Sequence, residues 1–338
     1  MTDEVGIMQH AIRSEPDPAH GYCTDDVARA LQIDLLHQRE LGWPAVADSA
    51  WRNVRFLTEA FDGPTGRFRN FRLIGGSWAE GAGSEDSHGR AVLALGETLA
   101  CSNDLQMQAS AGRLFEAALP RTLDFGHVRP WAYVVLGCDA ALRGTRSPLA
   151  RDILENLAVR LAAEFPRGSS RDAAEWPWPG PVATYDNGVL PQALIVAGRR
   201  LRRSDWVDLG LRGLRWLLAA QTAPDGHLTP VGNRGWWPRG ATPARFDQQP
   251  IEAVSLLEAA RSAYEATEDP AWAGAMESAF GWFLGDNDLG IALADPERGA
   301  CRDGLGVDGR NGNQGAESTL AWLLAVERIR ALRCGSRS

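Results

Sequence analysis

The stretch TYDNGVLPQALIVAG, residues 184–198, begins with an aromatic residue, an acid and an amide and continues as an unbroken apolar segment. Apolar residues at helical spacing predict a helix over about 186–200. A surface helix keeps one polar face, but this segment has none, so we expect the helix to be buried all round. Its polar residues, Tyr185, Asp186 and Asn187, are gathered at its N-terminal end.

The other helical segments are separated by loops that alternate in length. The predicted helices cover 24–40, 47–61, 84–100, 105–118, 128–143, 148–164, 186–200, 204–221, 248–265, 270–284 and 314–333. Short loops follow the first, third, fifth, seventh and ninth helices and join antiparallel neighbours, whereas longer loops follow the others. The odd-numbered helices are the more apolar, which predicts inner helices, and the even-numbered ones are amphipathic, which predicts outer helices.

This alternation predicts an all-α fold, an (α/α)6 toroid of helical hairpins with the long loops at one mouth. We expect a single domain over residues 1–338. An open solenoid of hairpins is the alternative, but no fixed sequence period supports it. The alternating segment GRFRNFRL, residues 66–73, predicts a small hairpin within a loop.

Composition excludes several classes of protein. The net charge is −8, which argues against a broad basic surface for nucleic acid. The five cysteines are scattered and form no paired motif, which argues against a disulfide framework or a zinc site. No apolar run is long enough to span a membrane, and a cytoplasmic location is expected. DNDLG (286–290) and DGRNGN (308–313) lack the spacing of a calcium loop, so we predict no metal and no cofactor.

Polar and aromatic residues recur at the N-terminal ends of all six predicted inner helices and in the loops that lead to them. Acids and amides are favoured at helix N-termini as caps, but capping does not call for Tyr, Arg, Trp or paired Gln at the same places. If the inner helices run parallel, these residues line one cavity. Carboxylate pairs there suit glycoside hydrolysis, with one acid protonating the leaving oxygen and its partner activating water or attacking.

The catalytic candidates are Asp86, Asp186, Asp247, Glu252 and Glu317. Glu252 and Glu317 lie inside their helices, a position that suits a general acid. Trp rings, amides and Arg would bind sugar rings and hydroxyls. The substrate-binding candidates are Tyr22, Asp25, Asp26, His88, Arg90, Arg129, Trp131, Glu175, Trp176, Trp178, Tyr185, Asn187, Trp236, Trp237, Arg245, Gln248, Gln249, Asn313 and Gln314.

Five motifs, GIMQHA with GYCTDDVARAL, EDSHGRAVLALG, TYDNGVLPQAL, FDQQPIEA and NQGAESTLAWLLA, span nearly the whole chain. Together they resemble a bacterial domain found beside, or fused to, glycosyltransferases of the retaining two-Rossmann type, which is similar to the six-hairpin (α/α)6-toroid glycosidases. The resemblance implies this fold, an oligosaccharide or glycan substrate and a glycosyltransferase partner. The chain departs from the usual D-N-A-R pattern at Val27 and at Gly188 and Val189.

The predicted function is that of a glycoside hydrolase or a phosphorylase. A sugar epimerase on the same toroid is the second hypothesis, although such epimerases use histidines deep in the barrel and only His88 is well placed. A non-catalytic glycan-binding module that serves a transferase is the third. A terpene-cyclase-like toroid is the fourth, suggested by AAQTAPDGHL (219–228), but the chain lacks an acidic D-x-D-D motif.

Overall fold

The computed structural model describes residues 1–168 and 174–335, which fall into two compact units, Met1–Arg160 and Leu161–Ser338. Each predicted helix is present, with ends within four residues of the predicted ones; the largest difference is at the start of the helix predicted over 47–61, which begins at Trp43. None of the described helices has the length and hydropathy needed to cross a bilayer.

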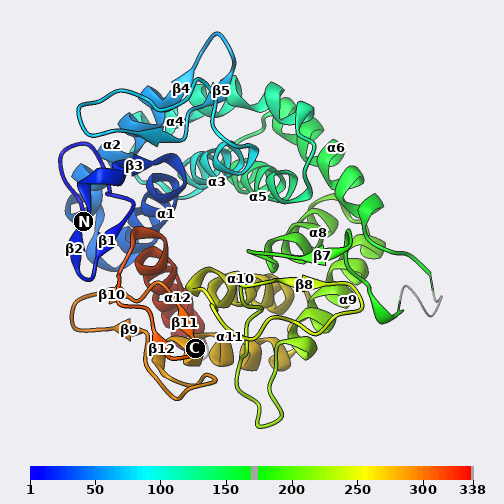
Figure 1. The fold of residues 1–338 in the computed structure, drawn as a ribbon. Helices are drawn as coiled ribbons and strands as arrows, with labels where there is room; N and C mark the ends of the chain where they lie inside the picture. The colour runs from blue at the N-terminus through cyan, green and yellow to red at the C-terminus, as the bar shows by residue number, and fades with distance from the viewer. Residues whose placement is uncertain (169–173, 336–338) are drawn as a thin grey trace. The chain divides into compact units, whose positions relative to one another are not determined.

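The N-terminal unit consists of helical hairpins connected by loops with short strands (Figure 1). Its helices are α1 (Thr24–Leu41), α2 (Trp43–Ala60), α3 (Glu85–Cys101), α4 (Leu105–Ala118), α5 (Val128–Gly144) and α6 (Pro148–Glu164), which continues past the end of the unit. The strands are β1 (Ala11–Ile12), β2 (Glu15–Pro16), β3 (Tyr22–Cys23), β4 (Phe61–Asp62), β5 (Arg67–Phe68) and β6 (Phe71–Arg72), and the short 3-10 helices are η1 (Pro18–His20) and η2 (Leu119–Asp124).

Helices α1, α3 and α5 pack side by side and run in the same direction. The pair Asp25–Arg90 joins the N-terminal ends of α1 and α3, and the Gln38 amide donates to the Cys101 carbonyl over 2.7 Å at their C-terminal ends. The start of α5 meets the start of α3 through Arg129 and Asp86, and Gly144 at its end lies against the Leu99 carbonyl. Glycines allow α3 and α5 to approach closely, because a Cβ at Gly137 would lie only 2.8 Å from Leu93 Cα. The predicted order of inner helices is therefore found in this unit.

The predicted hairpin over 66–73 is wrong. Strand β5 pairs with β4, whereas β6 pairs with β3 just before α1. The alternating segment therefore forms one strand in each of two separate ladders. The partner of β6, strand β3, lies about fifty residues earlier in the chain. That contact holds the start of α1 against the loop that precedes α3.

The C-terminal unit repeats the hairpin arrangement. Its helices are α8 (Val189–Leu201), α9 (Ser204–Ala220), α10 (Pro250–Thr267), α11 (Pro270–Leu284) and α12 (Ala316–Gly335). Its strands are β7 (Val182–Ala183), β8 (Trp237–Pro238), β9 (Ala294–Asp295), β10 (Ala300–Cys301), β11 (Leu305–Gly306) and β12 (Gly309–Arg310). The β7–β8 and β11–β12 pairs lie in the loops that lead to α8, α10 and α12.

Helices α8 and α10 are parallel neighbours, and α10 also packs on α12 (Figure 1). The start of α8 is bonded to Glu252, one turn into α10, and near the other end Arg199 pairs with Glu265 at 3.5 Å. Gly188 permits the close approach at the start, since a Cβ there would overlap the Ser255 carbonyl. All three helices therefore begin on the side of the unit where the long loops lie.

Candidate active site

In the N-terminal unit, the predicted residues on α1, α3 and α5 form neutralising pairs. Arg90 Nε lies 3.4 Å from the Asp25 carboxylate, and its guanidinium lies 4.3 Å from the Tyr133 ring centre. Arg129 lies 3.9 Å from the Asp86 carboxylate. These four charges cancel, and their side chains are each only 10–20% exposed. The pairs therefore fix one another more firmly than isolated surface charges would.

The start of α1 is also tied down. The Asp26 carboxylate accepts from Arg29 over 2.7 Å and from the Cys23 thiol over 3.1 Å. The Tyr22 hydroxyl donates to Asp3, and burial together with that carboxylate raises the pKa of Tyr22 to about 12. Both residues were predicted to bind substrate, but they are 2–3% exposed and their polar atoms bond within the protein. Their role is to hold the helix start.

The prediction that His88 binds substrate is wrong. The ring is fully buried between Phe68 and Phe125. Its Nδ1 accepts from the Phe68 amide over 3.3 Å, and its Nε2 lies 3.1 Å from the Ala118 carbonyl and donates to it. Burial and the charge of Arg67 lower the pKa of His88 to about 3, so the ring is neutral and both nitrogens are used.

The prediction for Trp131 is corrected in the same way. This ring is 6% exposed, its indole N–H donates to the Phe125 carbonyl over 2.8 Å, and Arg160 lies over its face at 4.2 Å. No open aromatic face is left for a sugar. The predictions for His88 and Trp131 relied on residue type and position near a helix start, which do not reveal whether a side chain points toward the core.

In the C-terminal unit, Glu252 organises the start of α8. Its carboxyl accepts from the Asp186 amide, from the Asn187 amide over 3.4 Å and from Asn187 Nδ2 over 3.0 Å. All three residues are at most 5% exposed. Burial and then the charge of Asp186 raise the pKa of Glu252 to about 8. This cluster therefore holds a carboxyl proton at neutral pH.

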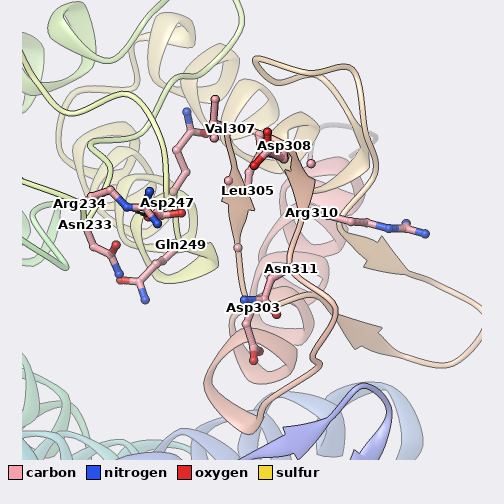
Figure 2. A pocket seen from close by; sticks show the side chains of 14 residues that line it. Asn233, Arg234, Asp247, Gln249, Asp303, Leu305, Val307, Asp308, Arg310 and Asn311 are labelled. Carbon is pink, nitrogen blue, oxygen red and sulfur yellow. Dashed lines mark ion pairs between the residues drawn. The ribbon is translucent and has the colours of Figure 1, made fainter.

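A pocket of about 550 Å³ opens beside the start of α10. Figure 2 shows Asn233, Arg234, Asp247 and Gln249 on one side and the β11–β12 hairpin on the other. Asp247, a predicted catalytic residue, lines this pocket and is paired with Arg234 at 2.7 Å. Gln249, a predicted binding residue, lines it as well.

The hairpin wall of the pocket was not predicted. Asp303, Val307, Asp308 and Asn311 line it, although DGRNGN was noted only as a weak calcium motif. Gly304 accounts for the close packing of this wall, since a Cβ there would lie 2.6 Å from the Gln248 carbonyl oxygen. A glycine-rich loop before a helix was the available signal, but the sequence does not show which loop it faces.

Most of the predicted sugar-stacking tryptophans instead pack on one another. Trp216 of α9 stacks on Trp237 with ring centres 4.5 Å apart and on Trp178 at 5.6 Å, and Trp176 meets both Trp216 and Trp237 edge-on. Trp176 and Trp178 are 2–4% exposed and their rings are covered by this cluster, so the structure shows them as packing residues, and that they bind substrate stays a prediction. Trp216 was missed because it lies on an amphipathic outer helix.

Trp236 differs from this stack. Its ring is partly exposed and lies 6.2 Å from the ring of Tyr185, which directly precedes Asp186. The β7–β8 ladder brings the two loops together by pairing Ala183 with Trp237. Of the predicted aromatic residues, this pair is the one that retains surface next to a predicted carboxylate.

Asp288 is a further residue that the sequence did not reveal. Its side chain is 1% exposed and accepts from Arg245 over 2.9 Å and from Gln248 over 2.5 Å. The Gln248 amide also donates to the Arg245 carbonyl and accepts from Trp282. Gln248 also lines the pocket, but its amide is bonded within the protein, and that it binds substrate stays a prediction. Arg245 is anchored to Asp288 although its side chain is well exposed.

The remaining candidates are dispersed within the C-terminal unit. Glu175 is exposed, Glu317 and Asn313 are half-buried, and Gln314 is buried at the start of α12. Within the described residues, no group of three or more His, Cys, Asp or Glu side chains is placed to hold a metal ion. That all six inner helices contribute to one cavity stays a prediction.

Backbone conformation separates some candidates from the rest. Six non-glycine residues in the described ranges have φ between 49° and 59°: Arg13, Asp186, Arg202, Trp236, Asp247 and Glu268. Arg202 and Glu268 end helices, and Arg13 lies between β1 and β2. The other three, Asp186, Trp236 and Asp247, are all predicted site residues. Left-handed backbone is unfavourable for a bulky residue such as Trp and often marks functional sites.

Comparisons with known proteins bear on the fold. No family model and no curated protein matches this chain. Several solved structures match it. A cellobiose 2-epimerase from Bacillus thermoamylovorans is 13% identical with a TM-score of 0.73, over 96% of this chain and 93% of that chain. A D-mannose isomerase is 10% identical with a TM-score of 0.73, over 98% and 93%.

An α-mannanase of glycoside hydrolase family 76 from Bacteroides thetaiotaomicron is 10% identical with a TM-score of 0.67, over 94% of this chain and 88% of that chain. The chain shares their fold. This confirms the predicted class, an all-α (α/α)6 toroid, and the expected likeness to enzymes with the six-hairpin glycosidase fold. At identities of 10–13% the likeness concerns the fold and not the reaction.

Proposed function

We propose that this chain is a glycoside hydrolase acting on an oligosaccharide or glycan, with its catalytic carboxylates in the C-terminal unit. The observation that carries the proposal is the set of three left-handed residues, Asp186, Trp236 and Asp247. Two of them are carboxylates, and the third is a partly exposed tryptophan whose ring lies 6.2 Å from that of Tyr185, the residue before Asp186. Strain of this kind persists only where the surrounding structure holds it.

The two carboxylates lie in contrasting settings. Asp247 forms an ion pair with Arg234 at the pocket wall, and a carboxylate held by a guanidinium suits the role of base or nucleophile. Asp186 lies beside Glu252, and this buried pair retains a proton at neutral pH because the pKa of Glu252 is raised to about 8. Glycosidases need one protonated and one ionised carboxyl group. Two carboxyl groups meet this need when their environments give them different pKa values.

The pocket suits a saccharide in its composition. Amide, carboxylate and guanidinium groups from Asn233, Gln249, Asp303 and Arg234 line it, and such groups exchange hydrogen bonds with hydroxyls. Tyr185 and Trp236 supply aromatic surface nearby. We propose a saccharide as the ligand of this pocket and, from the motif resemblance, a glycosyltransferase as the partner.

A sugar epimerase is the second candidate, because the structurally similar proteins include a cellobiose 2-epimerase and a D-mannose isomerase. Epimerisation needs a free base beside the sugar carbon. His88, the histidine predicted for that role, is buried with both nitrogens bonded. The hydrolytic proposal therefore agrees better with the residues of this chain.

The test is a screen of aryl glycosides and oligosaccharides with product chromatography, with and without phosphate, and NMR in D2O to detect epimerisation. We expect hydrolysis that Asp186→Asn and Asp247→Asn each abolish while the circular dichroism spectrum is unchanged. Asp208→Asn, an exposed carboxylate on α9, is the matched control and should keep full activity. Full activity in both site variants would reject the choice of carboxylates, and deuterium incorporation without cleavage would favour the epimerase.

A further inference from the structure

Glu252 is enclosed rather than open to a ligand. It lies in the first turn of α10 and is 1% exposed. Its oxygens face the start of α8, where they accept from two consecutive backbone amides and from the Asn187 side chain. The same Asn187 Nδ2 also donates to the Thr184 carbonyl over 2.8 Å. One carboxyl group thus fastens the whole 184–187 turn.

The turn that Glu252 fastens contains the left-handed Asp186, whose φ is 49°. Asp tolerates this conformation better than most residues, but it still needs support from its surroundings. The Glu252 carboxyl group provides that support, because its two oxygens accept from the Asp186 amide, the Asn187 amide and Asn187 Nδ2. The direction of the Asp186 side chain therefore depends on Glu252.

We propose that Glu252 is a positioning residue that acts through Asp186 and does not itself touch the substrate. This inference rests on the proposed function and revises the expectation that Glu252 is the general acid. Glu252 holds the Asp186 backbone in its left-handed conformation, so that the Asp186 carboxyl group faces the glycosidic oxygen in one orientation. The proton that this coupled pair holds in common passes to the oxygen when it lies on Asp186. A displacement of about 1 Å at such a group costs about a hundredfold in rate.

The charged groups around Glu252 indicate that its titration is coupled to Asp186 and not to the other acids of α10. Asp186 is the charge that acts on Glu252 from the α8 side. The next acid on α10, Glu258, is paired with Arg261 and with Arg328 of α12. Farther along α8, Arg199 is paired with Glu265. Each of these ion pairs is satisfied locally, so Asp186 remains the charged neighbour of Glu252.

The experiment follows the Asp186 amide proton by NMR in isotope-labelled full-length protein. A bond from this amide to a carboxylate shifts its resonance downfield, and the shift should titrate with a midpoint near the Glu252 pKa of about 8. This measurement needs no variant and no substrate. An Asp186 amide that does not titrate between about pH 6 and 10 would overturn the proposal.

Glu252→Gln supplies the second arm, because it keeps the shape of the side chain but offers one acceptor oxygen where the carboxyl group uses two for the Asp186 and Asn187 N–H groups. We expect the Asp186 amide to move upfield, and kcat to fall about a hundredfold with little change in KM. Ser255→Ala, a buried residue one turn along α10, is the matched control and should change neither quantity. A rise in KM at unchanged kcat would show substrate contact and overturn the proposal.

The two proposals fail separately. If no glycoside is cleaved but the Asp186 amide titrates and responds to Glu252→Gln, the proposed function is wrong and the positioning role stands. If glycosides are cleaved and Asp186→Asn abolishes cleavage, while Glu252→Gln leaves kcat and the amide unchanged, the function stands and the positioning role is wrong.

Discussion

Replacing Asp34 by Asn should stabilise the protein at neutral and alkaline pH. Asp34 lies on α1 facing α2, is 8% exposed, and accepts from Asn53 Nδ2 over 2.8 Å. Burial raises its pKa from 3.8 to about 7, and hydrogen bonds from Ser49 and Asn53 and the charge of Arg52 offset only part of that rise. The amide of Asn keeps the acceptor for Asn53 without the buried charge.

The sign and size follow from linkage. A folded-state pKa above the unfolded one means that the folded protein binds the proton more tightly, so stability falls as pH rises from the unfolded pKa of 3.8 to about 7 and is level beyond it. The shift of about three pH units, at 1.36 kcal/mol each, sets an upper bound of about 4 kcal/mol on the cost of ionising Asp34.

The assay is urea unfolding of wild type and Asp34→Asn at several pH values. The difference in free energy of unfolding should grow from near zero at about pH 4 to between about 1 and 4 kcal/mol at about pH 8. Asp208→Asn, on the surface of α9, should show no such growth. A stability difference for Asp34→Asn that is flat over this range would refute the reasoning, as would a loss of stability at pH 8.

Two further predictions concern packing and charge. Gly137→Ala should destabilise the protein by about 1–3 kcal/mol, despite the better helix propensity of Ala, because the added Cβ would overlap the backbone of α3. Gly274 has open space around it, so Gly274→Ala should slightly stabilise the protein. Thermal unfolding of both variants tests whether the two changes in stability have opposite signs. Glu258→Gln should lower the free energy of unfolding by about 3–5 kcal/mol at pH 7, because the charges of Arg261 and Arg328 outweigh the effect of burial and lower the pKa of Glu258 to about 2. Acid unfolding curves should show this loss of stability shrinking as pH falls from 4.5 toward 2.

The helices were predictable because their apolar periodicity is clear and several of their boundaries have a local cause. Asp104 and Asp269 accept from the first amides of α4 and α11, and Gly42 and Gly285 end α1 and α11. Apolar periodicity fixed the faces between those ends. The segment over 66–73 was not predictable, because alternation predicts a strand but does not identify its partner, which is β4 for one half and β3 for the other.

The candidate site was predictable in position but not in roles. The gathering of polar residues at helix starts is found within each unit, since Asp25 meets Arg90 and Asp186 meets Glu252. The roles depend on side-chain direction, which sequence alone does not give. His88 turned toward the core, and Asp288 turned inward to anchor Arg245 and Gln248 from a loop that carried no clear signal.

Each left-handed residue of the proposed site is held by a different contact. Glu252 holds Asp186 from α10, the Asn233 amide donates to the Asp247 carbonyl over 3.0 Å, and the Ala244 amide donates to the Trp236 carbonyl over 3.0 Å. The paired residues Asp25, Arg90, Asp86 and Arg129 of the N-terminal unit lack a left-handed backbone and neutralise one another in two pairs. Paired opposite charges are fixed without strain and are suited to binding. Carboxylates placed on strained backbone need support from outside their own loop, and this is why we expect a buried residue such as Glu252 to affect turnover without contacting the substrate.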